Sequence, residues 1–126
     1  MLAYHAPLRD FRFVLHELLD VEEGWAGLPA HAAALTPDTA DAVLEAAARF
    51  CERELLPLAG PGDEEGCRFA DGEVWTPHGF REAYRLFCEG GWASLACDPA
   101  DGGQGLPEVV NLALTEMVCS TNLAFG

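Results

Sequence analysis

The chain has 126 residues, of which 50% are apolar and 22% are charged. This is the composition of a globular protein with room for one domain, and it excludes a disordered chain. The 21 acidic residues stand against seven basic ones, all arginine, which gives a net charge of -14. Such a charge repels nucleic acids and anionic lipid headgroups, so we expect neither as a partner. Polar residues interrupt the longest apolar run, which is therefore too short for a membrane span.

Cysteine and histidine give no sign of a metal site or a disulfide framework. The five cysteines contain no Cys-x-x-Cys pair, and the four histidines show no metal-ligand spacing. Cys51 and Cys88 fall on the apolar faces of expected helices, where free thiols act as small hydrophobes. The first residues lack the basic start and apolar core of a secretion signal, so we expect a cytoplasmic protein.

The first expected helix covers residues 10–19, where apolar side chains such as Leu15 and Leu18 recur at helical spacing. A second short turn follows, with Val21 and Trp25 four positions apart. Glycine and proline then break the pattern, so the stretch up to residue 35 is expected to be irregular.

The second expected helix covers residues 37–56. Thr36 supplies a cap oxygen and Pro37 a first-turn proline, the arrangement that favours a helix N-terminus. Pro57 is expected to end this helix. The stretch 60–66 that follows is rich in glycine and acidic residues, which favours a solvated loop over a metal site.

A short β-hairpin and a third helix are expected next. An Asp-Gly pair at 71–72 lies between two short half-apolar runs, which predicts a two-residue hairpin over residues 68–75. A Thr-Pro pair then predicts the start of a helix over residues 77–89. The apolar face of this helix includes Phe80 and Tyr84.

The last expected helix covers residues 107–122 and is apolar on nearly all sides. Only Glu108, Asn111 and Thr115 form a polar stripe, and the chain reaches Gly126 while still hydrophobic. A helix of this kind needs neighbours on most of its sides, so we expect the chain to be part of a larger protein. In isolation it would self-associate through this helix.

The stretch 102–105, Gly-Gly-Gln-Gly, precedes the last helix and allows two interpretations. A glycine-rich loop before a helix can cradle a phosphate with its backbone N–H groups. The alternative is a tight turn, because glycine adopts positive φ without cost. The second interpretation is favoured, since no lysine follows and no strand precedes the loop.

Several stretches together resemble the acyl-CoA dehydrogenase family. They are Tyr-His-Ala-Pro-Leu-Arg-Asp-Phe-Arg-Phe-Val-Leu-His-Glu at 4–17, Gly-Trp at 91–92, Gly-Gly-Gln-Gly-Leu-Pro at 102–107 and Glu-Met at 116–117. The opening stretch is similar to the subgroup with an N-terminal extension, which includes long-chain and methylmercaptopropionyl-CoA dehydrogenases. Asp101 departs from the family, in which an aromatic residue usually precedes the glycine pair.

The resemblance implies an all-α fold with one short hairpin. Residues 1–35 would be the N-terminal extension, and residues 36–126 the family's N-terminal helical domain, incomplete at its C-terminus. The remaining domains of the same enzyme would be a middle β-domain and a C-terminal four-helix bundle. The complete enzyme would be a homo-oligomer that binds FAD between domains and subunits and passes electrons to an electron-transfer acceptor.

The resemblance also assigns the chemistry to the complete enzyme. Its reaction is the α,β-dehydrogenation of acyl-CoA thioesters, with a glutamate base that removes the α-proton. That glutamate would lie in the missing part. We therefore expect no catalytic residue, no metal and no bound FAD on this chain alone.

The resemblance also implies that residues of this chain form part of the wall of the substrate-binding tunnel. The last helix and its continuation would help to line the acyl-chain tunnel, with Phe125 at a tunnel-facing position and Asn122 as a second candidate. The alternative for Phe125 is an aromatic side chain that only packs, because pocket walls and cores use the same residue types.

A function of another class is also open. The chain could be a free-standing helical interaction module, whose apolar last helix docks into a groove of a partner. A docking helix should carry a distinct polar face, and this one has only a narrow polar stripe, which favours the dehydrogenase.

Overall fold

The computed structural model describes residues 3–28 and 35–126, and helices predominate in this part of the chain. The elements in chain order are α1 (Leu8–Arg12), η1 (Phe13–Leu18), α2 (Val21–Ala26), α3 (Pro37–Phe50), η2 (Cys51–Leu55), α4 (Leu56–Glu65), β1 (Arg68–Ala70), β2 (Glu73–Trp75), α5 (Phe80–Glu89), η3 (Trp92–Ser94), η4 (Pro99–Asp101) and α6 (Glu108–Thr121). The η1 and η2 segments are π-helical, and η3 and η4 are 3-10 turns. The expected all-α fold with one hairpin is confirmed.

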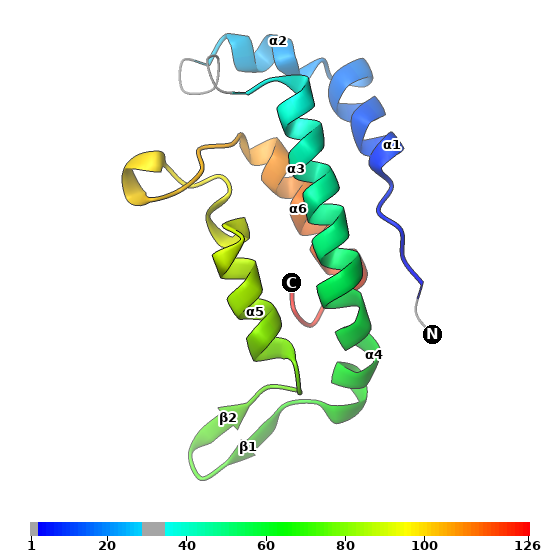
Figure 1. Ribbon diagram of the computed structural model, residues 1–126, viewed down its shortest axis with the longest axis vertical. Coiled ribbons are helices and arrows are strands. Elements are labelled where there is room, and N and C mark those ends of the chain that lie inside the picture. Colours follow the sequence, from blue (N-terminus) through cyan, green and yellow to red (C-terminus); the bar gives the residue numbers. More distant parts are fainter. Residues whose placement is uncertain (1–2, 29–34) are drawn as a thin grey trace.

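The segments α3, η2 and α4 form one long rod, which runs down the middle of Figure 1. Its start is as expected, because the Thr36 hydroxyl oxygen accepts a hydrogen bond from the Thr39 N–H at 3.2 Å. Its expected end at Pro57 is wrong, and so is the expected loop over 60–66. Pro57 lies in the first turn of α4, where a helix does not need its N–H group, so the rod continues to Glu65.

Tertiary packing also explains why the glycine-rich α4 is helical. Gly62 is buried, and its Cα lies under the ring of Phe80, so that an added Cβ would meet the ring at 2.5 Å. The absence of a side chain at Gly62 therefore lets α4 and the start of α5 approach each other. From the sequence alone, the low helix propensity of glycine predicts a loop here, because the contact with Phe80 is not visible in the sequence.

The helix α6 packs against α3 and η2 and provides much of the core. Its buried residues include Val110, Leu114 and Met117, which meet Leu44 and Leu55 in one apolar cluster. The opposite face is exposed at Thr115, Glu116 and also Leu112, whose side chain is 60% exposed. Within the described residues the rod covers one broad face of α6 and leaves the apolar Leu112 exposed, so the expectation that α6 needs further neighbours stays a prediction.

The first helix begins at Leu8 and ends at Leu18, close to the expected limits of 10–19. Leu15 is buried, but Leu18 and Leu19 are exposed, which differs from the expected apolar face. The reason is the π-helical η1, whose wider turn shifts the residues off the 3.6-residue period. The second short turn is confirmed as α2, and the irregular stretch before residue 35 lies mostly outside the described residues.

The hairpin has the expected position and turn. Its strands pair antiparallel with Ala70 opposite Glu73, which leaves Asp71 and Gly72 as the two turn residues. Their φ angles of 53° and 79° are both positive, as a type I′ turn requires.

The helix α5 begins at Phe80 and not at the expected Thr-Pro pair. The backbone N–H of His78 donates to Glu65 Oε2 at 2.8 Å, and Gly79 at φ 88° turns the chain into the helix. Tyr84 and Cys88 were expected on the apolar face, but both are exposed. Ala83 and Phe87 face the core, whereas Tyr84 and Cys88 lie at the outer edge of the apolar stripe and reach solvent.

Substituting Gly62 by Ala should destabilise the protein, because the new methyl group and the Phe80 ring cannot share the same space. We expect a loss of about 1–3 kcal/mol in the free energy of unfolding. Gly60 lies in the same helix, and a Cβ added there would have no other atom within 4 Å, so Gly60→Ala is the matched control. The control should stabilise by up to about 1 kcal/mol, since alanine favours a helix. Urea denaturation measures both, and equal stabilities would contradict the packing argument.

Candidate functional site

A groove of about 510 Å³ opens between the end of the hairpin, the first turns of α5 and the C-terminal turn. We call it the hairpin groove. Its lining residues include Trp75, His78, Phe80, Arg81, Tyr84 and Phe125. The lining is mostly apolar and aromatic, which is typical of a site for a small apolar ligand.

Phe125, one of the two residues expected at the substrate, lies in the wall of this groove. Its ring centroid is 6.3 Å from that of Phe80 and 5.7 Å from that of Phe87, the latter in an edge-to-face arrangement. Edge-to-face packing of this kind holds an aromatic ring in a defined orientation. The Phe125 side chain is half-buried, so it both packs on α5 and presents a surface to the groove.

Asn122, the other expected residue, is only 3% exposed and lies beneath the C-terminal turn. Its side-chain amide donates to the backbone carbonyl of Leu55 at 3.2 Å, and its side-chain oxygen accepts from the Phe125 N–H at 3.2 Å. Asn122 therefore fastens the end of α6 to η2 and fixes the position of Phe125. It acts on the groove through Phe125 and is not part of the groove wall.

The charge of the groove differs from that of the chain as a whole. None of the described residues that line it is acidic, whereas Arg81 and His78 are basic. Next to it, the Arg68 guanidinium lies over the Trp75 ring, 5.7 Å from the centroid. Because the Glu65 carboxylate also lies beside it and accepts from the His78 N–H, the groove is suited to an apolar chain without a defined preference for a charged end.

The glycine-rich turn before α6 uses its own backbone donors. The N–H groups of Gly103, Gln104, Gly105 and Leu106 donate to the carbonyls of Asp98, Ser94, Cys97 and Leu95, at distances from 2.9 to 3.1 Å. A phosphate would need these same groups. The interpretation as a tight turn is confirmed, and the phosphate cradle is excluded for these donors.

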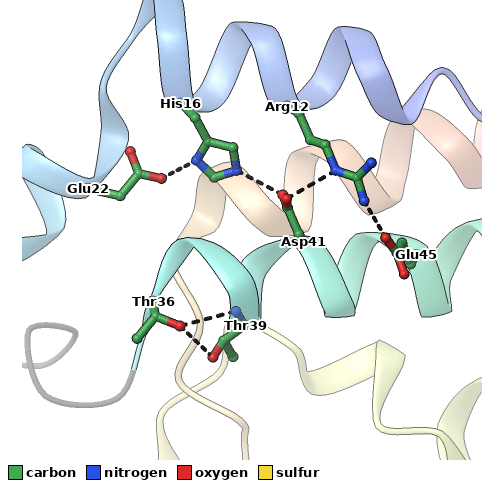
Figure 2. A network of polar contacts seen from close by, with 7 residues as sticks. All are labelled: Arg12, His16, Glu22, Thr36, Thr39, Asp41 and Glu45. Carbon is green, nitrogen blue, oxygen red and sulfur yellow. Dashed lines mark hydrogen bonds and ion pairs between the residues drawn. The ribbon is translucent and has the colours of Figure 1, made fainter.

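A cluster of polar side chains joins α1, η1, α2 and α3 (Figure 2). His16 of η1 lies between Glu22 of α2 and Asp41 of α3, with Nδ1 facing Glu22 and Nε2 at 2.8 Å from Asp41 Oδ1. Arg12 Nε donates to Asp41 Oδ2 at 3.0 Å, and the same guanidinium also bonds Glu45. We call Arg12, His16, Glu22, Asp41 and Glu45 the latch cluster.

The latch cluster determines the charge state of His16. Burial is the largest single effect and would lower the pKa of His16, but the hydrogen bonds to Asp41 and Glu22 and their negative charges outweigh it. The pKa of His16 is therefore raised above its usual value of 6.5. A protonated imidazole is the form that these carboxylates stabilise.

The described residues contain no group of three or more side chains placed to bind a metal ion. Cys51 is buried, and this burial raises the pKa of its thiol to about 11. The thiol is therefore protonated near neutral pH and behaves as the expected small hydrophobe. Cys88, which was also expected to pack as a small hydrophobe, is instead exposed to solvent.

No helix in the described part of the chain is long and apolar enough to cross a membrane.

Sequence reasoning missed the latch cluster, although the sequence holds a signal for it. Arg12 and His16 are four residues apart, as are Asp41 and Glu45. Each pair therefore lies on one helix face, and the two faces carry opposite charge. The groove residues Arg81 and His78 had no comparable signal, because only the fold brings them beside Phe125.

Known proteins similar to this chain are enzymes of one kind. No family model matches the chain. It is 39% identical over 127 residues to the 3-methylmercaptopropionyl-CoA dehydrogenase of Ruegeria pomeroyi, with 99% of this chain and 21% of the relative covered. It is 30% identical over 117 residues to the butyryl-CoA dehydrogenase of Syntrophomonas wolfei, with 90% of this chain and 19% of the relative covered. The chain thus spans about a fifth of the length of these relatives.

Substituting Asn122 by Ala should lower the free energy of unfolding by about 1–3 kcal/mol, because the buried Leu55 carbonyl loses its amide donor. Asn111→Ala is the matched control on the same helix. The amide of Asn111 bonds an exposed Glu108 carboxylate, so its loss should change stability by less than about 0.5 kcal/mol. Chemical denaturation of both variants checks this, and similar losses would contradict the role given to Asn122.

Proposed function

Because this chain belongs to the acyl-CoA dehydrogenase family, we propose that it is the N-terminal helical part of an FAD-dependent acyl-CoA dehydrogenase. The observation that carries this proposal is the similarity along 99% of the chain to a relative of that name. The mostly helical fold with its one hairpin supports it. The same similarity disfavours a free-standing interaction module.

The complete enzyme would introduce a double bond between the α- and β-carbons of an acyl-CoA thioester. FAD, when bound, supplies the acceptor for the hydride that leaves the β-carbon. Removal of the α-proton requires a carboxylate base, which we assign to the part of the enzyme outside this chain. The role of this chain is then to bind and orient the substrate.

The glycine-rich turn does not supply free donors for a flavin pyrophosphate. A flavin dinucleotide needs backbone donors for its pyrophosphate, and the donors of the glycine-rich turn are bonded within the turn. The hairpin groove offers mostly apolar and aromatic walls with one arginine, Arg81. We therefore assign FAD binding to the remaining domains and derive no step through it here.

The groove supports a role in holding the acyl chain. Phe125, Phe80 and Trp75 present apolar surface, which excludes water from a bound chain. Phe125 would contact the acyl chain directly. Asn122 would be a positioning residue, because it fixes Phe125 through the hydrogen bond to its backbone N–H.

The division of the chain is part of the same proposal. Residues 1–35 would form an N-terminal extension, and residues 36–126 the helical domain that carries the groove. In the complete enzyme we expect a homo-oligomer in the cytoplasm, with an electron-transfer protein as the acceptor. The exposed Leu112 and Leu123 are the side chains that further domains of the enzyme would cover.

The complete protein that carries this chain tests the proposal directly. After purification it should hold flavin, with the two visible absorption bands of oxidised flavin. Anaerobic addition of a straight-chain acyl-CoA should bleach these bands, because electrons pass from the substrate to the flavin. A flavin-free protein, or a flavin that no acyl-CoA bleaches, would contradict the proposed function.

The groove assignment is tested by substitutions at Phe125 in the complete enzyme. Phe125→Trp narrows the groove and should lower kcat/KM for long acyl chains about 10-fold or more, with a smaller effect on short chains. Phe125→Ala should shift the preference toward longer chains. Phe69→Ala is the control, because Phe69 on the hairpin is 73% exposed. Equal effects on all chain lengths would contradict contact between Phe125 and the acyl chain.

A further inference from the structure

His16 has a carboxylate on each side of its ring, and the two come from different helices. Nδ1 faces Glu22 of α2, and Nε2 lies 2.8 Å from Asp41 Oδ1 of α3, as Figure 2 shows. The side chain of His16 is 18% exposed, and those of Glu22 and Asp41 are 24% and 27% exposed. The three groups are thus partly withdrawn from water, where a charged interaction is screened less than on an open surface.

Only one form of the ring satisfies both neighbours. An ionised carboxylate accepts hydrogen bonds and cannot donate one. Neutral imidazole has a single N–H, so one ring nitrogen would turn a lone pair toward a carboxylate. The imidazolium ion has two N–H groups and donates to Glu22 and Asp41 at once.

The charges around His16 favour the same form. Arg12 of α1 contributes one positive charge, while Glu22, Asp41 and Glu45 contribute three negative ones. With neutral His16 the latch cluster has a net charge of -2, and with the imidazolium ion it has -1. Protonation therefore relieves repulsion between carboxylates from α2 and α3.

The bonds of His16 join short segments whose fully buried side chains are few, namely Leu15 and Trp25. The helix α2 has six residues, too few to be stable alone in water. It is anchored by Trp25, which is 5% exposed, and by the bond from Glu22 to His16. Leu15, next to His16, is 4% exposed and packs in the main core.

We propose that His16 is a proton-dependent latch that fastens α2 and η1 to α3 when the ring is charged and releases α2 when the ring loses its proton. The rod and α6 remain folded in both states, because α6 packs on α3 and η2 through buried residues outside the latch cluster. The device is independent of the function proposed above, since it uses no residue of the hairpin groove.

The direction of the pH dependence follows from linkage. The pKa of His16 is raised in the folded chain, so its contribution to stability is complete below the unfolded value of 6.5. The contribution is lost as the pH rises through the raised pKa. The latch is therefore closed in mildly acidic solution and open in alkaline solution.

Two mass-spectrometric measurements on the complete protein test the latch. Exchange of the imidazole C2 hydrogen reports the protonation of His16, and amide exchange of peptides from 17–28 reports the opening of α2. After correction for intrinsic rates, α2 opening should rise several-fold between about pH 6 and about pH 9, in step with the loss of the His16 proton. Unchanged opening over this range, or a ring that is neutral throughout, would overturn the proposal.

Variants separate the latch from a general loss of stability. In His16→Gln, α2 should open to the same extent at all pH values, at or above the alkaline level of the unsubstituted protein. His5→Gln is the control, because the His5 side chain is 93% exposed, and it should keep the pH dependence. Glu22→Gln keeps the ring but removes one carboxylate, so the transition should move to lower pH. A transition that stays in place in Glu22→Gln would overturn the latch even where His16→Gln fails to fold.

Discussion

The buried seam between α6 and the rod of α3 and η2 supports the other parts of the structure. Leu44, Leu55 and Met117 meet there with 2% exposure or less, so the seam excludes water almost completely. The amide of Asn122 closes its end by bonding the carbonyl of Leu55. This bond is valuable because a buried carbonyl without a donor would cost the folded state about 1–3 kcal/mol. Apolar burial and the hydrogen bond from Asn122 to Leu55 thus fix the direction in which the chain leaves α6.

The seam fixes the groove on one side of the molecule. Once Asn122 is held, the backbone turns over it and Phe125 meets Phe80 and Phe87 of α5. The rod in turn reaches α5 through Gly62, where the missing side chain admits the ring of Phe80. The groove is therefore built from the ends of three elements and not from a continuous motif. Its mostly apolar wall fits the proposed role in holding an acyl chain.

The latch cluster lies apart from this arrangement and follows a different principle. Its residues are partly exposed and charged, and they add ion pairs to the apolar contacts that Leu15 and Trp25 make with the core. Interactions of this kind respond to pH and salt, whereas the seam does not. The molecule thus combines a core that is insensitive to solution conditions with an N-terminal part whose attachment depends on protonation.

The sequence alone determined the helical class, the hairpin turn at Asp71, the cap at Thr36 and the family resemblance, because each depends on local backbone preference or on a contiguous motif. Tertiary structure decided the continuation of the rod past Pro57, since Pro57 follows the π-helical η2 and the Phe80 ring packs over Gly62. Tertiary structure also gave Phe125 and Asn122 different roles, although they lie only three residues apart in the sequence. One faces a groove and the other fills a buried hydrogen-bonding position, because packing between distant segments sets the direction of each side chain.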